Sequence, residues 1–197
     1  WAADGSFEAW GNAAYGGDSS AVNLTNVVGA SCGQYACVAW TNDGNFEAWG
    51  NVVFGGNSSA VHLTNVVGAH CGGGACVAWT ADGAFEAWGA KAYGGDSSQA
   101  HLTNVIGAHC GNTVGCVAWA ANGLIYWNDV APVVVNLTDV VGAHCGFVAC
   151  AAWTASGDLH TWGGKNPNRG GDSSGVSLDN VTGVRCGSGA CVAWSAG

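Results

Sequence analysis

The chain has 197 residues, enough to bury one sizeable core. It contains 34 glycines, 11 tryptophans and 10 cysteines, and its 13 acidic and 4 basic residues give a formal net charge of −9. Nucleic acids attract clustered lysine and arginine, which this composition lacks, so we expect no nucleic-acid partner. No segment reaches the roughly 18 apolar residues of a membrane span, so we also expect no membrane insertion.

The first 23 residues contain a turn, a short strand and a polar loop. Ala-Asp-Gly at 3–5 is typical of a tight hairpin turn. In the segment FEAWG at 7–11, apolar and polar residues alternate so that Phe7 and Ala9 face one way and Glu8 and Trp10 the other, which predicts a strand. The loop GGDSS follows at 16–20.

The same pattern then recurs along the rest of the chain. Residues 24–50 read LTNVVGASCGQYACVAWTNDGNFEAWG, and residues 63–89 read LTNVVGAHCGGGACVAWTADGAFEAWG, at an offset of 39. Related units start at Leu102, Leu137 and Leu178. The runs VVGAHC and ACVAW are short, apolar and separated by glycine, which predicts two strands in each unit before the FEAWG strand.

A repeating unit of about 39 residues that contains only strands is typical of a propeller blade. We therefore predict an all-β fold, a single five-bladed β-propeller over residues 1–197, closed by pairing of its N- and C-terminal strands. A β-solenoid is the rival architecture. Trp1 and Trp194 occupy the same position in the repeat, so they cannot both fill it in one closed ring. Either one end is displaced, or the chain is a segment of a longer repeat array. The predicted blades are 24–61, 63–100, 102–135, 137–176, and 1–23 combined with 178–197.

The cysteines fall into five pairs spaced C-x4-C or C-x5-C, and each pair flanks a turn between two predicted strands. Such hairpin positions lie near ~5.5 Å between Cα atoms, within the range that a disulfide accepts. Regular pairing of this kind predicts disulfides and an oxidising compartment. The pairs are Cys32 and Cys37, Cys71 and Cys76, Cys110 and Cys116, Cys145 and Cys150, and Cys186 and Cys191.

Four Asn-x-Ser/Thr sequons support a secreted or cell-surface location and are candidate glycosylation sites. They lie at Asn23, Asn57, Asn136 and Asn180. Three His-Cys pairs raise metal binding as an alternative to disulfides, but the corresponding units carry Ser31 and Arg185 instead of histidine. We therefore predict no metal, no cofactor and no catalytic residue.

The repeated histidines can be interpreted in two ways. His70, His109 and His144 share one position in the repeat, and His62 and His101 share another. They are either polar caps at strand ends or a pH-responsive rim, because imidazole titrates near physiological pH. The repeated glutamates, of which Glu8, Glu47 and Glu86 share one position, predict a solvated face.

The loops with the pattern GG[DN]SS place an aromatic residue next to Asp or Asn and serine hydroxyls. An apolar platform beside polar groups is what a sugar pocket needs, so these loops are candidate ligand sites. The alternative is that the Asp or Asn caps the turn through its own backbone. The candidate residues are Tyr15, Asp18, Phe54, Tyr93, Asp96 and Asp172.

The repeat resembles that of the regulator of chromosome condensation family. The resemblance rests on Cys71-Gly72, on the run from Thr80 to Gly83, on Trp88-Gly89, and on their counterparts in the other units. It implies a propeller that serves as an interaction platform, although the family ring has seven blades of longer repeats. Repeats that end in a GGDSS loop are similar to the repeat arrays of algal and cyanobacterial surface proteins.

These observations predict a non-catalytic extracellular module that is structural or mediates interactions. We expect it to be part of a larger cell-surface or secreted assembly, with other proteins or further copies of itself as partners. The alternative is a carbohydrate-binding lectin with sites repeated on each blade, in which case glycans are the ligands.

Overall fold

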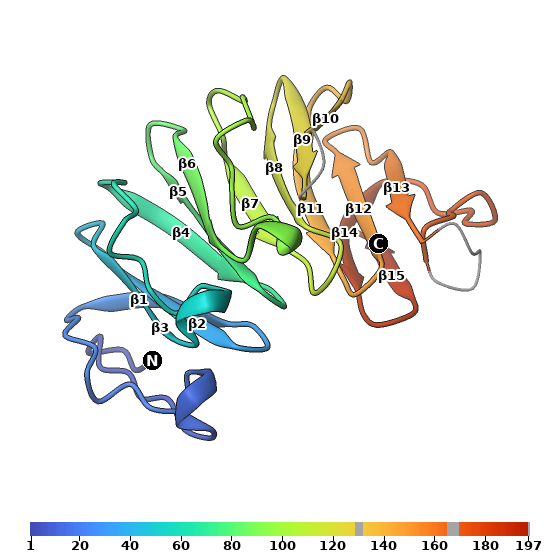
Figure 1. The fold of residues 1–197 in the computed structure, drawn as a ribbon. Coiled ribbons are helices and arrows are strands. Elements are labelled where there is room, and N and C mark those ends of the chain that lie inside the picture. Colours follow the sequence, from blue (N-terminus) through green and yellow to red (C-terminus); the bar gives the residue numbers. More distant parts are fainter. Residues whose placement is uncertain (129–131, 165–169, 197) are drawn as a thin grey trace.

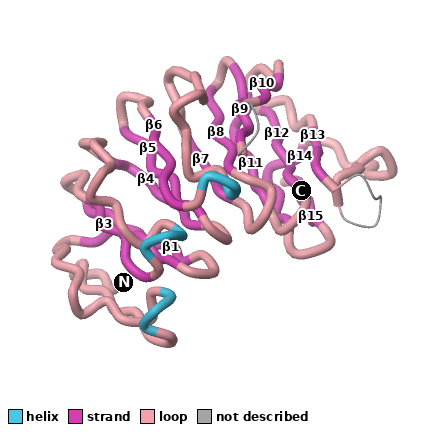
Figure 2. The backbone as a smooth tube through the Cα atoms, viewed as in Figure 1, coloured by secondary structure: helices cyan, strands magenta, loops and turns pink. Residues whose placement is uncertain are grey.

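The computed structural model describes residues 1–128, 132–164 and 170–196. This part of the chain is built from strands and three short 3-10 helices, η1 (Ala13–Tyr15), η2 (Val52–Phe54) and η3 (Lys91–Tyr93) (Figure 2). No helix in it is long and apolar enough to cross a membrane. The strands are β1 (Val27–Cys32), β2 (Ala36–Thr41), β3 (Phe46–Gly50), β4 (Val66–Cys71), β5 (Ala75–Thr80), β6 (Phe85–Gly89), β7 (Gly107–Cys110), β8 (Cys116–Ala120), β9 (Gly123–Trp127), β10 (Val133–Val135), β11 (Val140–Cys145), β12 (Ala149–Thr154), β13 (Leu159–Gly163), β14 (Val181–Cys186) and β15 (Cys191–Ser195).

The strands form antiparallel sheets that follow one another like the blades of a fan (Figure 1). The sheets of the described residues are β1–β3, β4–β6, β7–β10, β11–β13 and β14–β15. Each takes its strands from one repeat unit, and the first strand of each sheet lies against the first strands of its neighbours. The units 102–135 and 137–176 each contain a stretch outside the described residues.

A glycine and a tryptophan face each other on the first two strands of every sheet. In the β4–β6 sheet Gly68 pairs with Trp79, next to a register shift that follows Val66. A Cβ atom on Gly68 would lie 2.2 Å from the indole ring, so only glycine leaves room for this tryptophan. The glycine of the repeated V-x-G motif therefore packs directly against the tryptophan of the repeated V-A-W motif.

The turn between the second and third strands supports the start of the next sheet. Gly44, in the turn between β2 and β3, accepts a hydrogen bond from the N–H of Val66 at 3.1 Å. The preceding residue, Asn65, has a left-handed backbone with φ 58°, which asparagine tolerates better than most residues. A Cβ atom on Gly44 would lie 2.5 Å from the Cα atom of Asn65, so the two units meet backbone to backbone.

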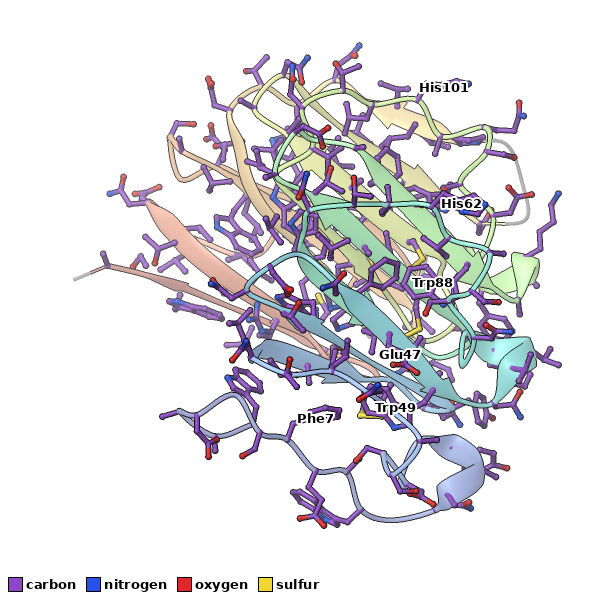
Figure 3. All side chains as sticks on the ribbon, turned by 90° about the vertical axis from the view of Figure 1, so that its left-hand side faces the viewer. Phe7, Glu47, Trp49, His62, Trp88 and His101 are labelled. Atoms are coloured by element: carbon purple, nitrogen blue, oxygen red, sulfur yellow. A yellow bond between two sulfur atoms is a disulfide. The ribbon has the colours of Figure 1, made fainter. Side chains whose placement is uncertain are left out.

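Tryptophans of the third strands fill the space between sheets. The indole N–H of Trp88 donates to the carbonyl of Gly55 at 2.8 Å, and Phe46 of the preceding sheet packs against the ring at 5.8 Å between centroids. Figure 3 shows the equivalent pair, Phe7 beside Trp49. Because Trp49 and Trp88 are only 8% exposed, these contacts form the core between blades.

Each predicted cysteine pair is closed by a disulfide within its own sheet. The Cα atoms of Cys71 and Cys76 are 4.0 Å apart, closer than the distance expected from the sequence. The next pair of residues, Gly72 and Ala75, is hydrogen-bonded. The cysteines therefore occupy the adjacent non-hydrogen-bonded position of the hairpin, where strands approach most closely.

The predicted pairing of the N- and C-terminal strands is not formed in the described residues, where β14 pairs with β15 alone. Phe7 and Ala9 instead pack against the core of the first sheet, and the carbonyl of Gly5 accepts from the N–H of Val27. The N-terminal segment is thus held on the side of the first sheet that faces away from the β4–β6 sheet. The two ends of the chain lie on different parts of the fan (Figure 1).

Candidate functional site

One residue in each unit, immediately before the first cysteine, lines the inner side of the fan. In three units this residue is a histidine whose side chain reaches the next sheet, and the Nδ1 atoms of His70, His109 and His144 accept hydrogen bonds at 3.4, 3.3 and 3.1 Å. The donors are the backbone N–H groups of Cys110, Cys145 and Cys186, respectively. We call the row of these side chains the inner seam. It consists of Ser31, His70, His109, His144 and Arg185.

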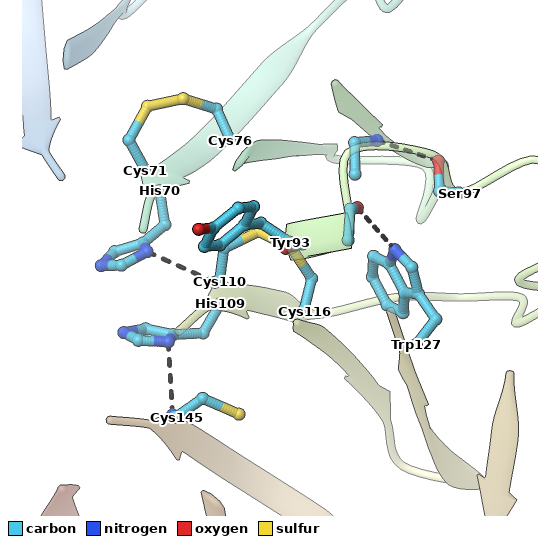
Figure 4. The surroundings of a disulfide bond; sticks show 12 residues. His70, Cys71, Cys76, Tyr93, Ser97, His109, Cys110, Cys116, Trp127 and Cys145 are labelled. Carbon is cyan, nitrogen blue, oxygen red and sulfur yellow. Dashed lines mark hydrogen bonds between the residues drawn. A yellow bond between two sulfur atoms is a disulfide. The ribbon is translucent and has the colours of Figure 1, made fainter. Parts of the chain in front are cut away.

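The three histidines of the inner seam are stacked on one another. The ring centroids of His70 and His109 are 3.7 Å apart (Figure 4), and those of His109 and His144 are 4.1 Å apart. Burial, together with the nearby cationic groups, lowers the pKa of His70 and of His144 to about 4. Burial also holds the pKa of His109 well below its usual value. At neutral pH the three rings are therefore uncharged.

A hollow of about 550 Å³ lies beside the inner seam, between the ends of the inner strands. Its wall includes the three histidines and the Cys-Gly turns of all five cysteine pairs. An imidazole that accepts at Nδ1 carries its proton at Nε2, so these rings present N–H donors rather than metal-binding lone pairs. The described residues also contain no group of three or more side chains arranged to hold a metal ion.

The GG[DN]SS loops use their polar atoms to hold their own backbone. The Oδ1 atom of Asp96 accepts from the N–H of Ser98 at 3.0 Å, and the hydroxyl oxygen of Ser97 accepts from the N–H of Ala87 on β6 at 2.9 Å. Asp18, Asn57 and Asp172 make the same bond to the second residue after them. These contacts match the capping interpretation of the loops.

Asp96 has one contact beyond its loop. Its Oδ2 atom lies 3.1 Å from the amine of Lys91 at the start of η3. Hydrogen bonds from Ser98, followed by the lysine, lower the pKa of Asp96 to about 2. The carboxylate is therefore ionised across the physiological range, with both of its oxygens engaged.

The aromatic side chains of the loops pack on one another rather than standing apart. Tyr35, from the turn between β1 and β2, lies between Tyr15 at 5.2 Å and Phe54 at 4.7 Å. Phe54 then meets Tyr93 edge to face at 6.1 Å. This row runs across three units. Because each ring contacts the next, the row is a continuous aromatic contact between units and not a set of separate platforms.

The sequon asparagines are all exposed, but their backbones differ. Asn180 has a left-handed backbone with φ 55°, and its Cα atom would lie 2.3 Å from a Cβ atom on Gly157. The Oδ1 atom of Asn57 is engaged by the N–H of Ser59 at 2.9 Å. Asn23 and Asn136 immediately precede the repeated Leu-Thr motif.

Sequence reasoning missed two roles of repeated polar residues. Glu47 and Glu86, which were expected on a solvated face, accept hydrogen bonds from the N–H groups of Asn23 at 3.2 Å and His62 at 3.3 Å. The histidines of the inner seam were expected as caps at strand ends or as a pH-responsive rim; they line the hollow and also bind the backbone of the adjacent sheet. Their recurrence at intervals close to the repeat length was the available signal. His62 and His101, which share the other repeated position, are exposed (Figure 3).

No protein-family model matches the chain, and no curated protein matches its sequence. Solved structures do share its fold. Human WBSCR16 superposes with a TM-score of 0.64 at 19% identity, over 87% of this chain and 58% of that one. Yeast RCC1 (Prp20), bound to Kap60, gives 0.61 at 16% identity, over 85% of this chain and 53% of that one.

The ectodomain of the receptor kinase CR4 from Physcomitrella patens gives a TM-score of 0.56 at 14% identity, over 92% of this chain and 52% of that one. The chain thus spans just over half the length of each of these structures. Identities this low support the fold and not a shared activity. Together with the stacked, disulfide-clipped sheets, they show an all-β fold that is similar to part of an RCC1-like β-propeller.

Proposed function

We propose that this chain is a non-catalytic extracellular interaction module, part of a larger cell-surface or secreted assembly. The observation that carries the proposal is the presence of one disulfide in every sheet. Disulfides persist in oxidising compartments and are rare in the cytosol. A blade of two to four short strands has little core of its own, so a covalent clip in each blade suits a rigid part of an assembly exposed outside the cell.

Structures with this fold support an interaction role. Yeast RCC1 is described in complex with Kap60 and with binding properties toward Gsp1p and histones. The CR4 structure is an ectodomain, so the fold also occurs outside the cell. The net charge of −9 argues against nucleic acids as partners, because binding to their phosphates needs a basic surface.

The described side chains do not favour an enzyme. The ionisable groups that gather in one place are the stacked histidines, and their Nδ1 atoms already bind backbone N–H groups of the next sheet. A general base needs a free lone pair within reach of its substrate. The contacts of the GG[DN]SS loops likewise do not favour the lectin alternative, because the Asp oxygens bind the backbone of their own loop and the rings of Phe54 and Tyr93 pack against other rings.

The proposal is tested on the native protein in intact cells. A membrane-impermeant biotin reagent should label it at the surface or in the medium, and carbodiimide cross-linking through its carboxylates should join it to a specific protein. Carboxylates are chosen because the chain has 13 acidic residues against 4 basic ones. Labelling only after lysis would contradict the location. A monomer with no cross-linked adduct under the same conditions would contradict the interaction role.

The glycan predictions are tested separately. The double variant Asp96→Ala/Tyr93→Ala should leave binding on a glycan array unchanged, because these side chains hold the loop rather than a ligand. Sugar binding by the parent protein that this variant abolishes would restore the lectin alternative. Intact mass before and after deglycosylation shows whether any of the four sequons is occupied.

A further inference from the structure

The inner seam has a geometry that depends on the protonation state of its histidines. His70 on β4, His109 on β7 and His144 on β11 stack with centroid distances of 3.7 and 4.1 Å. Each ring also accepts a backbone hydrogen bond from the sheet that follows it, and Figure 4 shows the bonds to His70 and His109. The hydrogen bonds require neutral imidazoles, since a neutral ring has one acceptor nitrogen and a protonated ring has none.

Protonation would convert each of these contacts from favourable to unfavourable. The Nδ1–H of an imidazolium would point at the backbone N–H that now donates to it, so donor would face donor. Adjacent rings would become like charges about 4 Å apart, and partial burial would reduce the screening by water. The same three side chains that join the sheets at neutral pH would push them apart in acid.

The surroundings of the rings offer no compensation for these charges. The charged groups that act on the three histidines are the histidines themselves and Arg185, which occupies the next position of the inner seam on β14. Their cross-strand neighbours on β5, β8 and β12 are Val77, Val117 and Ala151, which are apolar and buried. No carboxylate faces them among the described residues that influence their titration.

At one junction between sheets, the residue of the inner seam is not a histidine. Between β1 and β4 the acceptor is the hydroxyl of Ser31, which receives the N–H of Cys71 at 3.4 Å. The backbone hydrogen bond beside it is the same with serine and with histidine. Gln34 donates to Gly72 at the serine junction, and Gly73 donates to Gly111 at the junction of His70, each at 3.1 Å. The chain therefore contains its own control, a junction with the same backbone bond whose side-chain acceptor is a hydroxyl that does not titrate.

We propose that His70, His109 and His144 form an acid-sensitive latch, which holds the sheets from β4 to β15 together while the rings are neutral and releases them when the rings are protonated. This inference does not rest on the proposed function. The pKa values of His70 and His144 are about 4 in the folded chain, against 6.5 for the free group. The stabilisation is therefore fully present above about pH 6.5 and is lost as the pH falls through 4.

The latch is tested by hydrogen exchange resolved to individual amides at pH 7 and pH 4, expressed as protection factors. The N–H groups of Cys110, Cys145 and Cys186 should lose at least about tenfold in protection at pH 4, while the N–H of Cys71 should change little. The variant His70→Ser/His109→Ser/His144→Ser, which copies the acceptor of Ser31, should remove this acid effect. The control His62→Ser/His101→Ser, at exposed positions outside the inner seam, should retain it.

Two results would overturn the latch. One is an equal loss of protection at Cys71 and Cys110, which would mean general acid unfolding. The other is an unchanged acid response in the triple serine variant. Should that variant fail to fold, His109→Ser alone removes both ring stacks and serves in its place. Titration of the three imidazoles by NMR gives an independent check, and pKa values near 6.5 would also contradict the latch.

Discussion

At the scale of single residues, glycine after the first cysteine of a unit decides how closely two sheets can approach. A Cβ atom on Gly33 would lie 1.8 Å from the carbonyl oxygen of Gly72, and one on Gly72 would lie 2.3 Å from that of Gly111. The carbonyls of Gly72 and Gly111 also accept the backbone hydrogen bonds between units, from the N–H groups of Gln34 and Gly73. In the repeated Cys-Gly pair, the cysteine forms the disulfide of its sheet, and the glycine leaves room for the backbone of the neighbouring sheet.

We predict that Gly72→Ala destabilises the protein by about 1–3 kcal/mol, because the added methyl group meets fixed backbone rather than a movable side chain. Gly187→Ala is the matched control at the same position of the last unit, where the nearest atom would be 3.8 Å away. Denaturant unfolding measures both. Equal stability of the two variants would contradict the close approach of the sheets.

At the scale of elements, the disulfide hairpin is the repeated stabilising unit. In the β4–β6 sheet it closes a loop between Cys71 and Cys76, which are buried at 2% and 0% exposure. Closing so short a loop restricts the unfolded chain only modestly in the chain-entropy account. The larger contribution to order comes from packing between sheets, where Val38, Val77 and Val117 are fully buried.

We predict that Cys71→Ser/Cys76→Ser lowers the free energy of unfolding by about 2 kcal/mol, the loss of loop-closure entropy for about six residues. Thermal unfolding compared with the parent protein measures the change. A variant as stable as the parent would show that the clip adds nothing to the blade.

The strands themselves could be predicted from the sequence because their signals are local. The VVGAHC and ACVAW runs became β4 and β5, and the turn at Gly83 has the positive φ of 83° that its Ala-Asp-Gly motif suggested. The role of Glu86 and the stacking of His70 on His109 could not be predicted. Both depend on contacts between residues 24 to 39 positions apart, whose geometry is set by the stacking of sheets.

At the scale of the whole molecule, the sheets form an open fan rather than the predicted closed ring (Figure 1). Trp10 is 87% exposed and Val192 is 60% exposed, whereas the equivalent Trp49 and Val38 in the first sheet are 8% and 0% exposed. The repeat pattern alone did not reveal this. Closure depends on the angle between successive sheets, which no single unit encodes.

We predict that Ala9 and Val192 lie far apart in solution, although their equivalents Ala48 and Val38 are cross-strand partners. Spin labels attached through unnatural amino acids at these two positions would leave the native cysteines untouched. Distances well beyond the ~5 Å between paired Cα atoms are expected. A short distance consistent with strand pairing would contradict the open fan and restore the closed ring.

The central claim is that each unit is an independently clipped blade of a protein exposed to an oxidising environment. Disulfide mapping tests it most directly: native protein is alkylated at the moment of isolation, cleaved without reduction and analysed by mass spectrometry. The account predicts five cross-links, each joining the two cysteines of one unit, and no alkylated thiol. Free thiols, or cross-links between cysteines of different units, would contradict it.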